Sequence, residues 1–102
     1  MESQERVQRF VENHDLTAPP AYRALDLVSE VGEVSKEIVT ATNYGERPGE
    51  THIAEDEIGD VLFALLALCS QLDIDAATAL ETSMTKYERR IESGGDPGSD
   101  MP

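Results

Sequence analysis

The sequence predicts an all-α domain, a four-helix bundle that assembles into an oligomer. Gly and Pro fall mainly within residues 17–20, 45–49 and 94–102, which leaves long segments without helix breakers. Aromatic residues make up only 5% of the chain, and β-branched residues are scattered rather than alternating, which favours helices over strands. A chain of 102 residues can build one four-helix core but not two independent ones.

The first half of the chain predicts two helices. Residues 3–14 have the pattern of an amphipathic helix, with Ser3 as its N-cap. Residues 16–20 form a connector, and Pro20 suits the first turn of the next helix. The second helix is expected to run from Ala21 to about Asn43. Its buried side would consist of Ala24, Leu27, Val28, Val31, Val34, Ile38 and Val39.

The third helix is predicted from residues 55–69, EDEIGDVLFALLALC. No charge, Gly or Pro interrupts the part from Val61 to Cys69, so this helix is apolar nearly all round. Such a helix belongs in a core or in an oligomer seam. It offers more apolar surface than three amphipathic neighbours would cover, which predicts an oligomer. Cys69 is expected to be a buried, reduced thiol.

The fourth helix is predicted to begin after Asp75, its N-cap, and to end near Glu92. Its apolar side would bury Ala76, Leu80, Met84, Tyr87 and Ile91. The domain is therefore expected to span residues 1–93. Residues 94–102 consist largely of Gly, Pro, Ser and Asp, and they predict a disordered C-terminal tail.

The net charge of −13 limits the partners of the protein. An acidic surface that is poor in Lys argues against nucleic acid and against an anionic membrane as partners. The same composition is typical of proteins from salt-loving organisms. A single Cys permits no disulfide within the chain, and the charged N-terminal segment lacks an apolar signal, so we expect a cytoplasmic protein.

Carboxylate pairs three residues apart point to a candidate site only through their placement. The chain has 21 carboxylates, so about four such pairs are expected by chance, and four occur. Two pairs border apolar helix faces, and a short turn over residues 43–50 would make their helices antiparallel neighbours. We therefore expect four carboxylates to face one another: Glu30, Glu33, Glu57 and Asp60.

The charges around these four residues suggest that they bind a cation. No Lys or Arg lies between Arg47 and Lys86, so the local sequence supplies no counter-charge, and a cation must come from elsewhere in the fold or from solution. Asp26 and Glu37 lie on the same stripe of the second helix, where we interpret them as a solvated acidic face.

Oxygen ligands without nearby His or Cys suit a hard cation, Mg²⁺ or Mn²⁺. A di-iron carboxylate bundle would need Glu-x-x-His motifs, and His14 and His52 match neither position. A Mg²⁺ ion held only partly by protein leaves coordination sites for phosphate oxygens and water, as phosphoryl chemistry requires.

Taken in order, these motifs resemble the MazG-like nucleoside triphosphate pyrophosphohydrolases of the all-α NTP pyrophosphatase superfamily. The family hallmark is Glu-x-x-Glu on one helix and Glu-x-x-Asp on the next, here Glu30 to Glu33 and Glu57 to Asp60. A Lys-aromatic-x-x-Arg segment follows in the family, and residues 86–90, KYERR, match it. The resemblance covers roughly residues 20–91. Some relatives have a basic or amide residue where this chain has Ser83.

The resemblance implies a MazG-like four-helix fold and Mg²⁺-dependent hydrolysis of a nucleoside or deoxynucleoside triphosphate to the monophosphate and pyrophosphate. Such an activity would serve as housekeeping of the nucleotide pool. The four carboxylates would hold the metal and carry catalysis, while Lys86 and Arg90 would bind the triphosphate. Family members of this size form homodimers or homotetramers.

Two alternatives stay open at the sequence level. The sister activity on phosphoribosyl-ATP shares the fold and the carboxylates. A non-catalytic acidic helical oligomer would use its carboxylates only for solvation, and the placement of two pairs at apolar borders counts against it. The basic cluster of residues 86–90 would then only favour a helix C-terminus. Four residues are candidates for contact with the base, or else structural: His14, Tyr22, Asn43 and Tyr44.

Overall fold

Four α-helices and one short 3₁₀ helix make up the regular structure in the computed structural model, which describes residues 2–98. The helices are α1 (Glu2–Asn13), α2 (Pro20–Ala41), α3 (Glu55–Gln71) and α4 (Ala76–Glu92), and the 3₁₀ helix η1 spans Pro48–Glu50. Residues 2–98 contain no strand. The predicted all-α class with four helices is therefore confirmed.

The helix starts follow local sequence signals in two of three predicted cases. Helix α2 begins at Pro20, whose missing N–H costs nothing at this position. Asp75 caps α4, because its carboxylate accepts a hydrogen bond from the Thr78 N–H at 3.1 Å. The predicted Ser3 cap of α1 is wrong, because that helix begins at Glu2 and takes Ser3 into its first turn.

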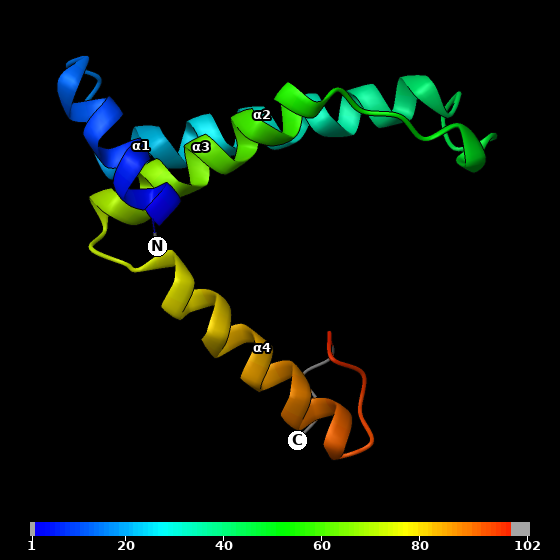
Figure 1. The fold of residues 1–102 in the computed structure, drawn as a ribbon. Helices are drawn as coiled ribbons and strands as arrows, with labels where there is room; N and C mark the ends of the chain where they lie inside the picture. Colours follow the sequence, from blue (N-terminus) through cyan, green and yellow to red (C-terminus); the bar gives the residue numbers. More distant parts are fainter. Residues whose placement is uncertain (1, 99–102) are drawn as a thin grey trace.

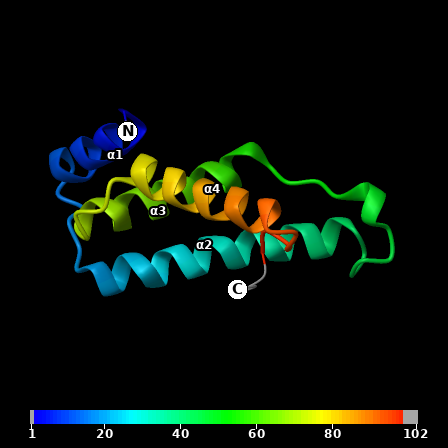
Figure 2. The same cartoon turned by 90° about the horizontal axis from the view of Figure 1, so that it is seen from below.

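Helix α3 lies at the centre of the packed part of the molecule (Figures 1 and 2). Helix α2 packs along it, and α1 packs against it. The most buried apolar residues of the described chain are Val11, Ala64, Leu66 and Ala67. Three of the four belong to α3, so one side of its apolar run forms the core, whereas Leu62 and Leu65 of the same run are 48% and 40% exposed.

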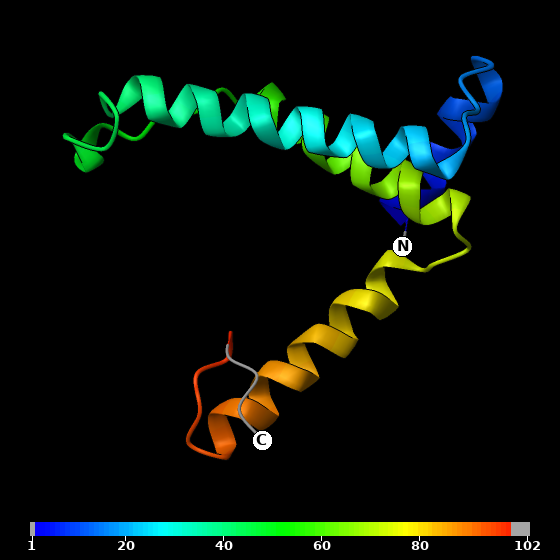
Figure 3. The same cartoon turned by 180° about the vertical axis from the view of Figure 1, so that it is seen from behind.

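Helix α4 projects away from the α2–α3 pair (Figures 1 and 3). The chain bends by 103° between α3 and α4. The radius of gyration is 16.7 Å, whereas a compact chain of this length has about 13 Å. The expected burial of the α4 apolar side is therefore wrong for the single chain: Leu80, Met84, Tyr87 and Ile91 are 41–57% exposed.

Helix α2 also carries apolar side chains that the described chain does not cover. Val28 is 69% exposed, and Val31 and Val39 are more than two fifths exposed, although the sequence predicted them to be buried. The reason is that, among the helices of residues 2–98, only α3 packs extensively on α2, and it covers one side of that helix. One chain therefore builds an open arrangement rather than a closed four-helix bundle. Cys69 is a free, half-buried thiol.

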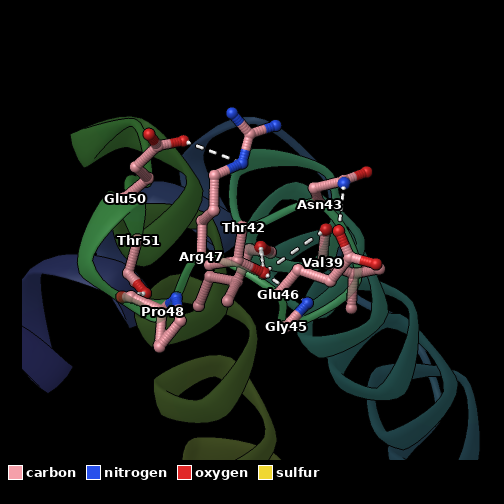
Figure 4. A network of polar contacts seen from close by, with 10 residues as sticks. Val39, Thr42, Asn43, Gly45, Glu46, Arg47, Pro48, Glu50 and Thr51 are labelled. Atoms are coloured by element: carbon pink, nitrogen blue, oxygen red, sulfur yellow. Dashed lines mark hydrogen bonds and ion pairs between the residues drawn. The ribbon is translucent and has the colours of Figure 1, made fainter.

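The connection from α2 to α3 is held by local polar contacts (Figure 4). Thr42 is buried, donates its hydroxyl to the Ile38 carbonyl at 2.8 Å and accepts from the Gly45 N–H at 3.1 Å. Gly45 has a φ of +86°, which suits Gly, but it lies three residues beyond the C-cap Thr42 rather than directly after it. These contacts turn the chain back toward α3.

The predicted tail begins with contacts to α4. Arg90 Nη1 donates to the Pro97 carbonyl at 2.8 Å, and the Gly98 N–H donates to Asp96 Oδ1 at 2.7 Å. The rest of the predicted disordered segment, residues 99–102, lies outside the described residues. Within residues 2–98, no single helix is long and apolar enough to span a membrane, and only the bent α3–α4 pair passes that test when taken together.

Candidate active site

Three carboxylates converge between α2 and α3. Glu30 of α2 and Glu57 and Asp60 of α3 each offer one oxygen, and these oxygens all lie within 4.8 Å of one another. Glu57 and Asp60 share a face because they are three residues apart on one helix. Glu30 reaches them because α2 packs along α3. We call these three residues the carboxylate group.

Partial burial and neighbouring carboxylates raise the pKa of Glu57 above its ordinary value. The largest cause is partial burial, followed by the charges of Glu37, Asp56, Asp60 and Glu33. Ionisation of Glu57 is therefore less favourable than that of a free carboxyl group, and a bound cation would offset this cost. Carboxylate oxygens from two helices are the ligands that Mg²⁺ and Mn²⁺ prefer, so the residues present fit the expected metal.

Glu33, the fourth predicted ligand, lies outside the carboxylate group. Its side chain is exposed and borders a neighbouring hollow of about 350 Å³. That hollow is lined by Glu33, Lys36, Glu37, Thr40, Ala41 and His52. Because the charge of Glu33 still raises the pKa of Glu57, Glu33 is a close neighbour of the group rather than a member.

Arg23 supplies a cation that the sequence analysis missed. A hollow of about 370 Å³ beside the carboxylate group is lined by Arg23, Asp26, Glu30, Asp60, Phe63 and Ala64. Arg23 is 8% exposed, donates through Nη2 to the Leu16 carbonyl, and lies 3.7 Å from Asp26. Its Nε has no hydrogen-bond partner within residues 2–98. The sequence could have indicated Arg23, because it lies seven residues before Glu30 and therefore on the same face of the helix.

Glu37 is not part of a solvated face, contrary to our prediction. Its side chain is half-buried, and its Oε1 accepts a hydrogen bond from the backbone N–H of Ala54 at 2.7 Å. Ala54 is the N-cap residue of α3. Glu37 therefore ties the start of α3 to the side of α2. Its partner is a backbone group far along the chain, which no sequence pattern reveals.

An apolar hollow of about 570 Å³ lies between α1 and α3, next to the carboxylate group. It is lined by Ser3, Arg6, Val7, Phe10, Gly59, Leu62, Phe63 and Leu66. Phe63 borders this hollow and also the one beside Glu30 and Asp60. The rings of Phe10 and Phe63 meet edge to face, with their centroids 5.9 Å apart.

None of the four residues that the sequence proposed for base contact is among those lining this hollow in residues 2–98. The ring centroid of His14 is 4.4 Å from that of Phe10, at the edge of the same aromatic cluster. Tyr22 and Tyr44 are 62% and 85% exposed. Asn43 donates to Glu46 within the α2–α3 connection. The sequence analysis did not single out Phe10 and Phe63, because an aromatic residue at helical spacing predicts core packing.

The predicted phosphate-binding residues lie on α4. The Lys86 Nζ is 5.1 Å from the ring centroid of Tyr87, and Arg90 bonds to the Pro97 carbonyl. All residues that line the hollow beside the carboxylate group belong to α2 and α3. The described chain therefore does not bring Lys86 and Arg90 to that hollow.

Comparison with known proteins identifies the family. The MazG nucleotide pyrophosphohydrolase domain matches residues 21–94. The chain is 38% identical over 68 residues to the uncharacterized protein YpjD of Bacillus subtilis, covering 63% of this chain and 60% of YpjD. A crystal structure of Bacillus subtilis YpjD, described as a proposed pyrophosphatase, has a TM-score of 0.71 and 33% identity over 87% of this chain and 92% of that one. The chain thus belongs to the MazG nucleotide pyrophosphohydrolase family.

Proposed function

We propose that this protein hydrolyses a nucleoside or deoxynucleoside triphosphate to the monophosphate and pyrophosphate, with Mg²⁺ or Mn²⁺ bound by the carboxylate group. The observation that carries this proposal is the convergence of Glu30, Glu57 and Asp60 within 4.8 Å across two helices. The family match supports a pyrophosphohydrolase. A divalent cation would supply charge neutralisation for the phosphates and for the leaving pyrophosphate.

Residues of the chain itself would accept the proton from water and add positive charge near the substrate. Water would form a bond to phosphorus while the bond to the bridging oxygen of the α–β anhydride breaks, so pyrophosphate leaves. Glu33 is exposed and lies outside the carboxylate group, which leaves its carboxylate available to accept a proton from that water. Arg23 lies beside Glu30 and Asp60 and would add positive charge near the substrate.

The apolar hollow between α1 and α3 is the place that we propose for the base of the nucleotide. Its volume of about 570 Å³ lies in the usual range for small-ligand pockets, roughly 300–1,000 Å³. Phe63 borders both this hollow and the one beside the carboxylate group, so a nucleotide could extend from one into the other. Stacking of a base on Phe10 or Phe63 would add about 1–3 kcal/mol.

We further propose that the working form is a homodimer or homotetramer. The α4 side chains Leu80, Met84 and Ile91 and the α2 side chains Leu25 and Val28 are all 47–69% exposed. Exposed apolar stretches of this kind are typical of subunit interfaces. Docking of α4 on the α2 of another copy would cover both faces and would carry Lys86 and Arg90 toward the partner.

Sedimentation at micromolar concentration tests the assembly. We expect an oligomer for the unaltered protein and a shift toward monomer for Leu80→Asp. Thr85→Asp is the control, because Thr85 is an exposed polar residue of α4, and it should leave the oligomer intact. A monomeric unaltered protein would refute the proposed assembly.

Release of pyrophosphate across a nucleotide panel tests the activity. The panel should include the common ribo- and deoxyribonucleoside triphosphates and phosphoribosyl-ATP, each with and without Mg²⁺. We expect Mg²⁺-dependent release of pyrophosphate and monophosphate from at least one triphosphate. Activity on phosphoribosyl-ATP alone would assign the sister reaction, and no release from any compound would contradict an enzymatic role.

A further inference from the structure

We propose that Glu37 is a positioning residue that keeps Glu57 in the carboxylate group by taking over the helix-capping contact that Glu57 would otherwise make. This inference rests on the proposed metal-dependent function. It concerns a residue that lies outside the carboxylate group and acts on the site through the backbone of Ala54.

The start of α3 has an N–H group that needs a partner from outside the helix. The first N–H groups of any α-helix lack acceptors within the helix. The N-cap residue of α3 is Ala54, which has no side-chain oxygen and makes no side-chain cap. A glutamate three residues after the N-cap commonly reaches back to the N-cap N–H, in the arrangement known as a capping box.

Glu57 occupies that third position. Its own N–H donates to the Ala54 carbonyl at 3.1 Å, which places it in the first helical turn. Its side chain would thus be the local candidate for the Ala54 N–H. Instead it contributes an oxygen to the carboxylate group with Glu30 and Asp60. A Glu57 side chain that turned back to cap the Ala54 N–H would move away from Glu30 and Asp60, so the cap and the carboxylate group compete for this side chain.

Glu37 resolves this competition from the neighbouring helix. Its Oε1 accepts the Ala54 N–H at 2.7 Å, a normal distance for a strong hydrogen bond. With that N–H occupied, Glu57 gains nothing by turning back toward Ala54. The negative charge of Glu37 also disfavours a second carboxylate at the same N–H, because like charges repel.

Two substitutions separate the hydrogen bond of Glu37 from its charge. Glu37→Gln keeps an oxygen that can accept the Ala54 N–H, whereas Glu37→Ala removes the acceptor. We expect Mn²⁺ affinity, measured by electron paramagnetic resonance of the free ion, to stay within about threefold in Glu37→Gln. We expect it to fall about 10- to 100-fold in Glu37→Ala, as for other residues that orient metal ligands. Glu46→Ala removes a carboxylate with a hydrogen bond in the same connection and should leave affinity unchanged.

Hydrogen exchange at the Ala54 amide provides a readout that needs no metal. In Glu37→Ala, the Ala54 N–H should stay protected, because Glu57 takes over as its acceptor. In the double variant Glu37→Ala with Glu57→Ala, that protection should disappear. If Glu37 only stabilised the fold, the Ala54 N–H would instead lose its protection in the single variant.

Three results would overturn the inference. Equal Mn²⁺ affinity in Glu37→Ala and the unaltered protein would show that Glu37 positions nothing. Equal weakening in Glu37→Gln and Glu37→Ala would assign the effect to charge. Loss of Ala54 protection in Glu37→Ala would show that Glu57 does not compete for the cap. If the unaltered protein binds no Mn²⁺, the metal site itself fails, which is a different result from any of these.

Discussion

The side chain of Gln4 clamps the start of α4: its Oε1 accepts a hydrogen bond from the Ala76 N–H at 2.8 Å. Its Nε2 donates to the Ile74 carbonyl at 2.7 Å. A single amide on α1 thus makes two hydrogen bonds to the turn between α3 and α4. Helix α4 packs closely on no other helix of the described chain, so this clamp is one of the few contacts that fix where α4 begins.

Loss of the clamp should destabilise the protein. We expect Gln4→Ala to lower the free energy of unfolding by about 1–3 kcal/mol, since two hydrogen bonds of about 0.5–1.5 kcal/mol each are lost. Urea unfolding at fixed protein concentration measures this change. Gln8→Ala is the control, because within residues 2–98 the Gln8 amide donates its hydrogen bond to the exposed Glu12, one turn away on the same helix. Equal effects of the two substitutions would show that the clamp contributes little.

Glu57 should make the metal-free protein sensitive to pH. Its folded-state pKa is raised above the ordinary value of 4.5, chiefly by partial burial and by Glu37. The protonated form is therefore the one that the fold favours, and this favourable contribution is lost as the pH rises through the raised pKa.

Glu57→Gln removes the carboxylate whose ionisation destabilises the folded state. Without metal, the variant should be more stable than the unaltered protein at neutral pH, and the difference should vanish below about pH 4.5. Urea unfolding of both proteins across this pH range, in the presence of a chelator, gives the comparison. A difference that grows in acid would mean that the pKa of Glu57 is lowered rather than raised.

Salt and Mg²⁺ should stabilise the protein by separate routes. Salt screens the repulsion of a chain with a net charge of −13, and most of its effect should occur below about 1 M. Mg²⁺ should add stability even in high salt by binding the folded site, by about 2.7 kcal/mol at 100 times its dissociation constant. Melting temperatures with Mg²⁺ and with NaCl of matched ionic strength test this. If the two salts shift the melting temperature equally, no specific site binds the metal.

The sequence predicted the carboxylate group because two independent patterns coincide there. Spacing of three residues places Glu57 and Asp60 on one helix face, and the border of an apolar run places that face against another helix. Glu30 satisfies the same two conditions on α2. Glu33 satisfies them as well but lies just outside the group. The position of α2 along α3 depends on the connection between them, and the sequence does not specify the geometry of that connection.

Other features of the site depend on partners that are distant in sequence. The contact of Glu37 is with the backbone N–H of Ala54. Every residue except Pro carries a backbone N–H, so the sequence offers no signal for this contact. The start of α4 is contacted by Gln4, more than 65 residues earlier in the chain. The apolar pattern of α4 predicted a buried side, but Leu80, Met84, Tyr87 and Ile91 are 41–57% exposed. Such a pattern cannot indicate whether the same chain covers that side.

We propose that Glu30, Glu57 and Asp60 hold the metal for pyrophosphate release. The most direct test compares Asp60→Asn with Asp56→Asn in a Mg²⁺-dependent pyrophosphate release assay. Both residues are exposed on α3 four positions apart, but only Asp60 belongs to the carboxylate group. We expect Asp60→Asn to lose activity by orders of magnitude and Asp56→Asn to keep most of it. Equal activities of the two variants would show that the carboxylate group does not hold a metal needed for the reaction.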